Sequence, residues 1–381
     1  MYLNDEQNLF RDSVAKVVSD AYEFQARQKI VQADPGYSRA HWKQAADLGW
    51  LGAGLPEAYG GLGGGPTEMA VVMEQFGRHL VTSPFLVSVV MSGAALGAAG
   101  NDAQKKAWLP ALAQGRILTF AHGEFEARHD TAFVETTAKR GGQGYVLDGT
   151  KVYVPFAGEA EAFLVSARTG GAVDAEDGLS LFIVPAKSAG LSFKAYRTHD
   201  GGRAADLVLA GVRVGAEALV GKEGGAFAAI ELALDHAAAL MCVEASGSMW
   251  AVHDQTLAYM KIRKQFGQTL GSFQALQHRI VDVFVKCQLA QSLAWDAVAA
   301  LSSSEPEDRM RRISAAKAHV AESAMIVGKE GVQLHGGVGM TNDIAVGHHF
   351  KRLAAIAHTY GDADHHLERF RRLSGPGGNI G

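Results

Sequence analysis

The chain has 381 residues, of which 48% are hydrophobic, and its formal net charge is −4. This length exceeds what one hydrophobic core usually supports, so two or three domains are expected. Charges of both signs are intermixed, and no apolar run approaches the ~20 residues of a membrane span, so neither a nucleic-acid partner nor a membrane is expected. Cys242 and Cys287 lack the spacing of a disulfide framework or metal site, and they are predicted to be buried thiols.

The N-terminal part is predicted to be helical. Its first residues lack the basic region and apolar stretch of a secretion signal, so a cytoplasmic location is expected. Asn4 and Gln7 form a capping-box pattern that starts a helix. A second helix is expected around residues 39–44, and the glycine-rich stretch 56–65 is predicted to be a loop before helices resume. This all-helical domain is expected to cover residues 1–115.

The hydrophobic period changes after Ile117. The runs 145–147 and 151–154 flank Asp148-Gly149, which predicts a tight hairpin turn. Short strands separated by turns predict a small β-barrel or sandwich domain over residues 116–222. Further strands are expected at 162–165, 181–184 and 206–209.

The helical period returns near residue 223 and predicts a helical domain over residues 223–373. A long helix is expected to end near Arg263, and further helices are expected from Phe273 and from Ser314. The last residues, 374–381, are glycine-rich and are expected to form a flexible tail. The predicted fold class is therefore α+β.

Two C-terminal segments carry a family resemblance. They are Arg263-Lys264-Gln265-Phe266-Gly267 and Gln333-Leu334-His335-Gly336-Gly337-Val338-Gly339-Met340. Their order and spacing resemble the C-terminal half of acyl-CoA dehydrogenases, and the order of helices, β domain and helices extends the resemblance over nearly the whole chain. It implies the acyl-CoA dehydrogenase fold, with an N-terminal helical domain, a middle β domain and a C-terminal four-helix bundle. It also implies a flavoprotein oxidoreductase of fatty acid metabolism, with an acyl-CoA substrate and FAD, because no side chain accepts a hydride.

The resemblance also implies which residues contact FAD. In the family the segments around Arg263 and Gln333 serve a flavin held mainly by another subunit, so a dimer or tetramer is expected. Tyr153 stands where the family has an aromatic residue against the flavin ring, whereas Gly123 and Pro155 stand where it usually has threonines that hydrogen-bond the flavin edge. Pro155 has no N–H to replace the lost hydroxyl. The residues placed against FAD are Phe120, His122, Gly123, Tyr153, Arg263, Phe266, Leu270, Gln274, Gln333, Gly336, Gly337 and Tyr360.

Structural roles are the alternative for several of these residues. Arg263 could make a salt bridge at a helix end, Phe266 could lie in a core, and the glycines could simply end a helix. Tyr153 could be an ordinary aromatic residue of a strand.

The catalytic glutamate of the family is missing. The resemblance places it at Gly361, and the second position that some members use falls at Ala237. Asp362 is adjacent, but a one-residue offset on a helix turns a side chain by ~100°, and stabilising the start of a helix is its alternative role. His236 and Glu244 are further candidates for the base. In the family the N–H of the glutamate also donates to the thioester carbonyl, and this N–H survives at Gly361. If only the base is missing, a glutamate restored at position 361 is expected to bring activity, whereas a chain that uses Asp362 as its base is expected to be active alone.

Pairs of adjacent histidines, His348-His349 and His365-His366, lie near the end of the chain. Adjacent histidines point to different sides of a helix, so no metal site is expected. The runs around them resemble small subunits of two-component, pimeloyl-CoA dehydrogenase-like enzymes, which implies that a larger acyl-CoA dehydrogenase subunit supplies the glutamate. A catalytically silent assembly subunit and a flavin monooxygenase or oxidase of the same superfamily are the alternatives.

Overall fold

The computed structural model describes residues 3–375. Within them the chain forms two compact units, one of residues 3–30, 66–81 and 238–375 and the other of residues 31–65 and 82–237. The predicted tail lies outside the described residues from Pro376 onward. Between residues 3 and 375, no helix has the length and apolar character needed to span a membrane.

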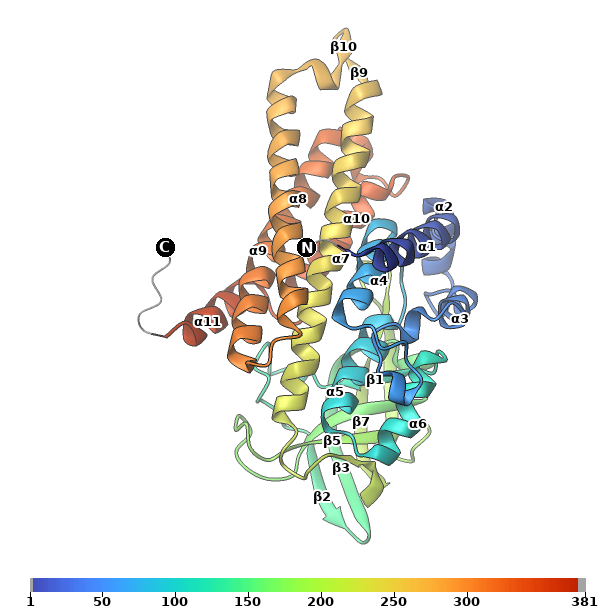
Figure 1. Ribbon diagram of the computed structural model, residues 1–381, viewed down its shortest axis with the longest axis vertical. Helices are drawn as coiled ribbons and strands as arrows, with labels where there is room; N and C mark the ends of the chain where they lie inside the picture. Colours follow the sequence, from blue (N-terminus) through green and yellow to red (C-terminus); the bar gives the residue numbers. More distant parts are fainter. Residues whose placement is uncertain (1–2, 376–381) are drawn as a thin grey trace. The chain divides into compact units, whose positions relative to one another are not determined.

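The first unit is helical (Figure 1). α9 packs against α8, α10 and α11, and small buried alanines of α7, α8 and α9 share one core cluster. The unit boundaries fall inside α2 and α7, which both continue into the second unit. The helices are α1 (Asp5–Ala21), α2 (Phe24–Gln32), α4 (Pro66–His79), α7 (Phe227–Ile262), α8 (Gln274–Ala300), α9 (Pro306–His335), α10 (Ala345–His358) and α11 (Ala363–Leu373).

Two glycines let α4 and α7 approach closely. A Cβ atom added to Gly77 of α4 would lie 1.9 Å from the carbonyl oxygen of Glu244, and one added to Gly247 of α7 would lie 2.1 Å from that of Glu74. Neither position therefore accepts a side chain. The predicted capping box of α1 is confirmed, because Asn4 Oδ1 accepts the Gln7 N–H at 2.8 Å and Gln7 Oε1 accepts the Asn4 N–H at 3.1 Å.

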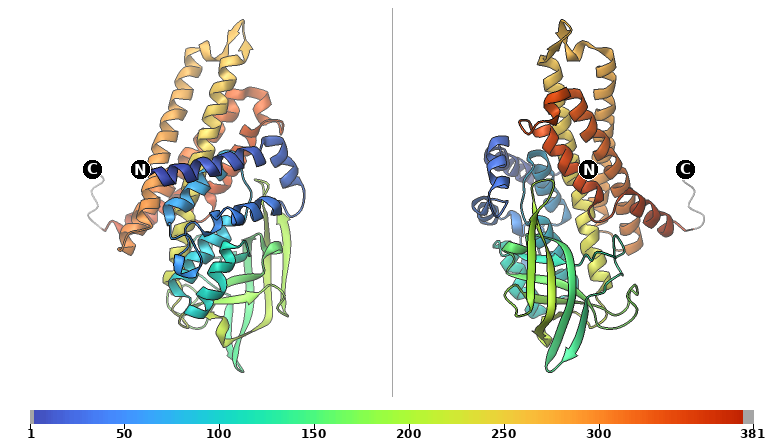
Figure 2. Two further views of the ribbon diagram at one scale, coloured as in Figure 1. Left: turned by 45° about the vertical axis from the view of Figure 1, so that its right-hand side comes forward. Right: turned by 180° about the vertical axis from the view of Figure 1, so that it is seen from behind.

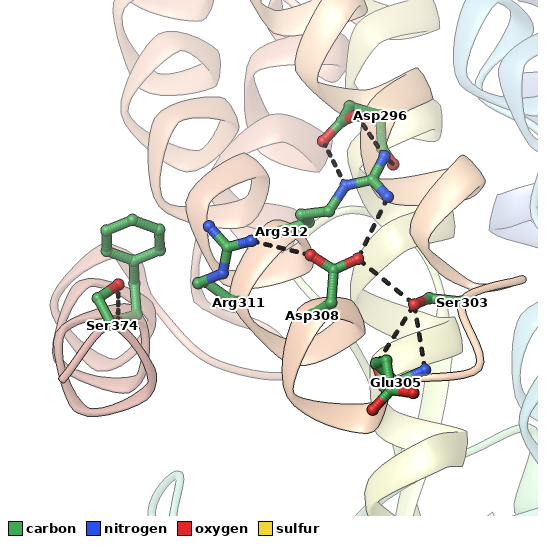
Figure 3. Close-up of polar contacts among 8 residues, drawn as sticks. Asp296, Ser303, Glu305, Asp308, Arg311, Arg312 and Ser374 are labelled. Atoms are coloured by element: carbon green, nitrogen blue, oxygen red, sulfur yellow. Dashed lines mark hydrogen bonds and ion pairs between the residues drawn. The ribbon is translucent and has the colours of Figure 1, made fainter. Parts of the chain in front are cut away.

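The connection between α8 and α9 is fixed by a small polar network (Figure 3). Arg312 of α9 bonds Asp296 of α8 through its Nε atom at 3.1 Å, and it also approaches Asp308 at 3.5 Å. Asp308 accepts further bonds from Arg311 at 2.8 Å and from the Ser303 hydroxyl at 3.4 Å. Exposed ion pairs of this kind add little stability, so the network chiefly sets the geometry of the connection.

The second unit combines helices with one β-sheet (Figure 2). In the described part of the chain the sheet has eight strands in the order β6-β7-β3-β2-β4-β5-β8, and β1 pairs in parallel with β4. The helices of this unit are α3 (Arg39–Asp47), α5 (Gly93–Ala99) and α6 (Asp102–Ala113). The strands are β1 (Leu118–Ala121), β2 (Thr137–Gly141), β3 (Gly144–Pro155), β4 (Ala162–Arg168), β5 (Leu179–Pro185), β6 (Leu191–Arg197), β7 (Arg203–Gly215) and β8 (Leu219–Val220).

The hairpin predicted at Asp148-Gly149 is wrong. β3 runs through both residues with only a register shift against β7, and the turn that joins β2 to β3 lies at 142–143. Gly149 has φ +150°, and a Cβ atom there would lie 2.5 Å from Oγ1 of Thr136. The glycine therefore serves the close approach of another segment and not a chain reversal.

One buried arginine joins two loops that follow parallel strands. Arg168, at the end of β4, donates hydrogen bonds to the carbonyl oxygens of Ala132, Val134, Gly170, Val173, Ala175 and Asp177, at distances from 2.6 to 3.4 Å. A guanidinium has five N–H groups, so at least one of them is shared between two of these six carbonyl oxygens. The loops 122–136 and 169–178 are thereby held by one side chain.

Candidate active site

The strand pair predicted to face the flavin is present in the β domain. The Val152 N–H donates to the Gly123 carbonyl at 2.8 Å, which joins β3 to the segment after β1. Between Lys151 and Val154 the register of β3 shifts against β7, and Tyr153 in this bulge has φ +50°. Its N–H donates to Oδ1 of Asp206 at 3.1 Å, and 39% of the residue is exposed. The backbone therefore turns Tyr153 out of the regular strand.

Gly123 and Pro155 differ in the backbone hydrogen-bond donor that each provides at the edge predicted to face the flavin. A Cβ atom at Gly123 would meet only the Val152 carbonyl oxygen, at 3.4 Å, so the position has room for a small side chain. Pro155 ends β3 opposite Ala204 and has no N–H. Of the two positions, only Gly123 retains a backbone donor.

A buried polar network centred on Lys151 joins the two strands of this pair. Lys151 is fully buried, and its ammonium donates to Glu124 at 2.6 Å, to the Ser166 hydroxyl at 2.9 Å and to the His122 carbonyl at 3.1 Å. Glu124 also accepts the backbone N–H groups of Glu135 and Thr136. Lys151 thus ties β3 to the segment 122–124.

The protonation states in this network follow from burial. Burial lowers the pKa of Lys151 to about 8, and the Glu124 carboxylate opposes that shift. The pKa of His122 falls to about 3, because its imidazole is buried and faces the Lys151 charge. His122 is therefore neutral at pH 7, and its Nδ1 lies 2.8 Å from the Ser166 hydroxyl.

The Arg263 segment forms a short hairpin between α7 and α8 (Figure 1). β9 (Lys264–Gln265) pairs with β10 (Gln268–Thr269), which leaves Phe266 and Gly267 as a two-residue loop with φ +52° and +83°. Two positive φ values are what a type I′ hairpin turn requires. Phe266 is 91% exposed, so it does not lie in a core.

The second C-terminal segment lies close to the first. Tyr259 of α7 stacks on His335 at the end of α9, with ring centroids 4.5 Å apart. This contact brings the residues that precede Arg263 beside the Gly336-Gly337 turn. A Cβ atom at Gly336 or Gly337 would meet nothing within 4 Å, so the backbone here is open to a ligand or another chain. Arg263 is exposed and makes no ion pair with any residue between 3 and 375, so it does not form the alternative salt bridge.

Leu270, Gln274 and Gln333 belong to the same helical unit. The Leu270 N–H donates to the Arg263 carbonyl at 2.8 Å, and this bond closes the base of the hairpin. Gln274 begins α8 and Gln333 lies in the last turn of α9, and both are exposed. Phe120, by contrast, is buried in β1 of the other unit.

Unusual backbone conformations coincide with the predicted aromatic contacts. In residues 3–375, positive φ values occur at six residues other than glycine, and Tyr153, Phe266 and Tyr360 are three of them. Side chains held at positive φ cost free energy and cluster at functional sites. The assignment of each of these three residues to a flavin contact stays a prediction.

Gly361 lies in the turn between α10 and α11 and has φ +100°. A Cβ atom there would lie 2.4 Å from Nε2 of His366 and 2.8 Å from Cδ2 of His365. A glutamate at position 361 would therefore require both an unfavourable backbone conformation and a movement of His366. The structure thus argues against the expected restoration of activity by a single Gly361→Glu substitution.

The other carboxylates near the predicted base positions are already engaged. Asp362 is the N-cap of α11, and its Oδ1 accepts the His365 N–H at 2.9 Å. Arg352 binds both oxygens of Glu244, at 2.6 and 2.8 Å. Ala237 is fully buried in α7 and carries no ionisable group. None of these residues offers a free carboxylate.

The histidine pairs have separate partners. His348 lies 3.3 Å from Arg27 and 3.1 Å from the Gln28 side chain, and His349 lies 2.8 Å from the Ser248 hydroxyl. Burial lowers the pKa of His349 to about 3. No cluster of three or more residues suited to a metal ion occurs within residues 3–375. Cys242 and Cys287 are both buried free thiols, and burial raises the pKa of each to about 12.

Comparison with known protein families identifies the chain. Its sequence matches the N-terminal domain of acyl-CoA dehydrogenase over residues 4–116, the middle domain over 119–212 and the C-terminal domain over 224–372. The chain belongs to the acyl-CoA dehydrogenase family. The predicted fold is therefore confirmed, and the protein is an oxidoreductase of a family of FAD-dependent flavoproteins that dehydrogenate acyl-CoA thioesters.

Individual relatives agree with this placement. Acyl-CoA dehydrogenase FadE12 of Mycobacterium tuberculosis is 31% identical over 311 residues, which cover 80% of each chain. Mitochondrial isovaleryl-CoA dehydrogenase of Pongo abelii is 28% identical over 358 residues, which cover 91% of this chain and 83% of the relative.

Two of the similar solved structures carry paired names. A variant of the Tcur3481-Tcur3483 steroid ACAD is 29% identical to this chain, with a TM-score of 0.87, and the match covers 97% of both chains. The ChsE4-ChsE5 complex from Mycobacterium tuberculosis is 25% identical, with a TM-score of 0.88 and the same coverage.

Sequence reasoning missed two buried lysines that the structure places behind the predicted sites. Lys151 interrupts a strand whose alternate positions are apolar, and Lys317 of α9 occupies a helical core position between Ile313 and Val320. A lysine at a core position is uncommon and normally has specific partners. A lysine within an otherwise apolar pattern was the sequence signal that could have revealed both residues.

Proposed function

We propose that this acyl-CoA dehydrogenase-family chain is the small subunit of a heteromeric enzyme that acts on CoA thioesters. The observation that carries the proposal is the turn at Gly361. Its φ of +100° and the 2.4 Å approach of His366 leave no space for a carboxylate side chain at the family's catalytic position. The chain therefore needs a base from elsewhere, and a homologous subunit with its own glutamate is the simplest source.

The two similar complexes support this proposal. ChsE4-ChsE5 is a complex of differently named chains, and the steroid ACAD carries a paired name of the same form. Each matches this chain over 97% of its length. A chain of this size and fold is therefore compatible with a two-subunit enzyme, and we extend that arrangement to the present protein.

The residues present fit a flavin. Gly123 keeps a backbone donor, Tyr153 offers an exposed ring, and the Gly336-Gly337 turn leaves the backbone accessible. Arg263 provides a planar guanidinium suited to a pyrophosphate. FAD supplies the hydride acceptor for the reaction, and the protein side chains hold and orient it. Because Arg263 and Phe266 face outward, we propose that they serve a flavin in a partner subunit.

The test compares the chain alone with the chain plus a homologue that carries the glutamate. Each preparation is mixed anaerobically with an acyl-CoA, and bleaching of the flavin absorbance is followed. A positioned base is worth ~10²–10⁴ in rate, so the pair should bleach at least ~10²-fold faster than the chain alone. Rapid bleaching by the chain alone would contradict the proposal. A nitroalkane in place of the acyl-CoA serves as the control for oxidase chemistry, and the proposal expects no bleaching with it.

A silent assembly subunit is the second candidate, and Pro155 is the observation that favours it. This residue lacks both the hydroxyl and the N–H that could bond the flavin edge. Flavin stoichiometry separates the two candidates. One FAD per chain in homo-oligomers of this protein would eliminate the silent subunit, whereas FAD found only in the presence of the larger homologue would support it.

A further inference from the structure

β3 carries a bulge at Tyr153. The pairing register of β3 against β7 shifts between residues 151 and 154, and across this shift Val152 and Tyr153 lie opposite one residue of β7, Asp206. A bulge of this kind leaves its extra residue outside the regular ladder of hydrogen bonds. The backbone N–H of Tyr153 therefore needs an acceptor other than the regular ladder partner.

The side chain of Asp206 supplies this acceptor. Its Oδ1 accepts the Tyr153 N–H at 3.1 Å and the hydroxyl of Tyr196, on β6, at 3.0 Å. Asp206 lies between Ala205 and Leu207, which are both in the core of the β domain, so its own side chain is on the opposite face of the sheet. Burial raises the pKa of Tyr196 to about 12, and the hydrogen bond to Asp206 adds to the shift, so this hydroxyl keeps its proton at pH 7.

The Asp206 bond holds Tyr153 in a conformation that is unfavourable for tyrosine. The φ of Tyr153 is +50°, and a left-handed backbone costs free energy for any residue with a Cβ atom. Glycine adopts this conformation without strain, so the backbone alone does not require a tyrosine here. The ring belongs to a residue that is 39% exposed. A strained tyrosine with an accessible ring indicates that the ring serves a ligand.

We propose that Asp206 is a positioning residue whose carboxylate, together with the Tyr196 hydroxyl, holds Tyr153 in the bulge so that its ring is presented to a bound flavin. The inference rests on the proposed function, because it takes FAD as the ligand of Tyr153. Asp206 acts through the backbone of Tyr153 and needs no contact of its own with FAD. The ring is ordered before the ligand arrives, which lowers the cost of binding.

The same strand pair offers a matched control. The other register shift of β3 against β7 lies between residues 147 and 149, and there the exposed Asp148 accepts the Gly211 N–H at 2.7 Å. Asp148 and Asp206 are thus both carboxylates that bond a backbone N–H at an irregular point of the same two strands. Asp148→Leu removes an equivalent hydrogen bond and leaves the bulge at Tyr153 in place.

The first measurement is FAD binding by the full-length protein, alone and together with a homologue that carries the glutamate. FAD is titrated while its fluorescence is followed, because a tyrosine ring in contact with a flavin quenches that fluorescence. If loss of the carboxylate reduces the presenting conformation to about a tenth of the population, Asp206→Leu should bind FAD about tenfold more weakly. The flavin bound at saturation should also be brighter than in the wild type, as in a Tyr153→Leu reference.

Further variants separate positioning from general destabilisation. Asp206→Asn keeps an acceptor oxygen for the Tyr153 N–H and should retain most of the affinity and quenching, and Asp148→Leu should match the wild type in both. Unchanged affinity and brightness in Asp206→Leu, or equal losses in Asp206→Leu and Asp148→Leu, would overturn the inference alone. Absence of FAD binding by the wild type in both preparations would refute the proposed function, and this inference with it.

Tyr196→Phe keeps the inference testable if Asp206→Leu does not fold. This variant removes one of the two donors to the carboxylate, so the bound flavin should be brighter than in the wild type but less bright than in Tyr153→Leu. Wild-type brightness in Tyr196→Phe, with Asp206→Leu unfolded, would overturn the inference.

A second measurement needs no flavin. Hydrogen–deuterium exchange of the flavin-free protein, followed by mass spectrometry, reports on the Tyr153 N–H directly. In Asp206→Leu the segment 152–155 should exchange about tenfold faster than in the wild type, whereas in Asp148→Leu it should exchange at the wild-type rate. A wild-type rate for this segment in Asp206→Leu would show that the carboxylate does not hold the bulge, and it would overturn the inference.

Discussion

Lys151 and Lys317 both place an ammonium group in the protein interior, but they donate to different kinds of acceptor. Lys151 in the β domain has a carboxylate partner, Glu124, at 2.6 Å, whereas the hydrogen-bond acceptors of Lys317 in the helical unit are the carbonyl oxygens of Ile356 and Gly361. Both fix a main-chain segment at a predicted site. The difference is that removal of Lys151 exposes a full opposite charge to a dry interior, whereas removal of Lys317 leaves only neutral dipoles unpaired.

Lys151→Met gives the largest expected effect. The variant leaves the Glu124 carboxylate buried without its counter-ion, which typically costs ~3–5 kcal/mol of unfolding free energy. Chemical denaturation measures the loss. The double variant Glu124→Gln/Lys151→Met removes both charges and should recover much of it. If the single variant loses less than ~1 kcal/mol, the pair is not the buried ion pair described above.

Acid should destabilise both units through one neutral histidine in each. The folded-state pKa values of His122 and His349 are about 3, below the ordinary value of 6.5. The unfolded chain therefore binds more protons between these pH values, and stability falls as the pH drops below 6.5. At pH 5 each histidine should cost ~2 kcal/mol. His122→Asn and His349→Asn should each flatten the measured pH dependence, and identical profiles for wild type and both variants would rule this origin out.

Lys317→Met should cost less than Lys151→Met. Two carbonyl groups lose a donor, and relief from burying an ammonium offsets part of that loss, so ~1–2 kcal/mol is expected. The same denaturation experiment provides the comparison. A loss as large as that of Lys151→Met would show that a carbonyl-bound lysine is as critical as an ion-paired one.

Gly361→Ala tests how tightly the turn between α10 and α11 is packed. Gly361 and Gly267 both have positive φ values, +100° and +83°, but only at Gly361 does an added Cβ atom collide with another residue. Gly267→Ala is therefore the matched control for backbone strain alone. Gly361→Ala should be destabilised by ~1 kcal/mol more than the control, because overpacking adds to strain. Equal losses would mean that His366 moves aside freely.

Phe266→Ala should have the smallest effect on stability. The side chain is 91% exposed, so the unfolding free energy should change by no more than ~0.5 kcal/mol. Alanine keeps the same backbone strain at φ +52°. FAD content and subunit association should nevertheless fall, and analytical ultracentrifugation with flavin absorbance measures both. Unchanged association and flavin content would remove Phe266 from the proposed site.

Local patterns in the sequence predicted much of the fold. The Asn4 capping box and the burial of both cysteines were recognisable because each depends on neighbouring residues or on plain apolar surroundings. Asp148-Gly149 was misread because the need for glycine comes from Thr136, which lies in the loop before β2. Its short-range signal was therefore the same as that of a true turn.

The sequence predicted which kind of site to expect, but it did not predict the backbone and side-chain geometry there. The motifs around Arg263 and Gln333 placed the chain in its family, and Gly361 was recognised as the position without its carboxylate. The φ of Gly361 and the imidazole of His366 beside it depend on the packed turn, so they could not be read from residue order. Lys317 was visible only as an irregularity in the apolar face of α9.

The hydrogen bonds of Arg168 bear on how freely this enzyme can diverge. All six acceptors are main-chain carbonyl groups in the loops 122–136 and 169–178, so the arginine recognises the path of each loop and not its side chains. The outward residues of both loops can therefore be exchanged through mutation while their paths are kept. Because the contacts of Arg168 do not depend on the loop sequence, selection can change the surface residues of both loops without changing the backbone that carries them.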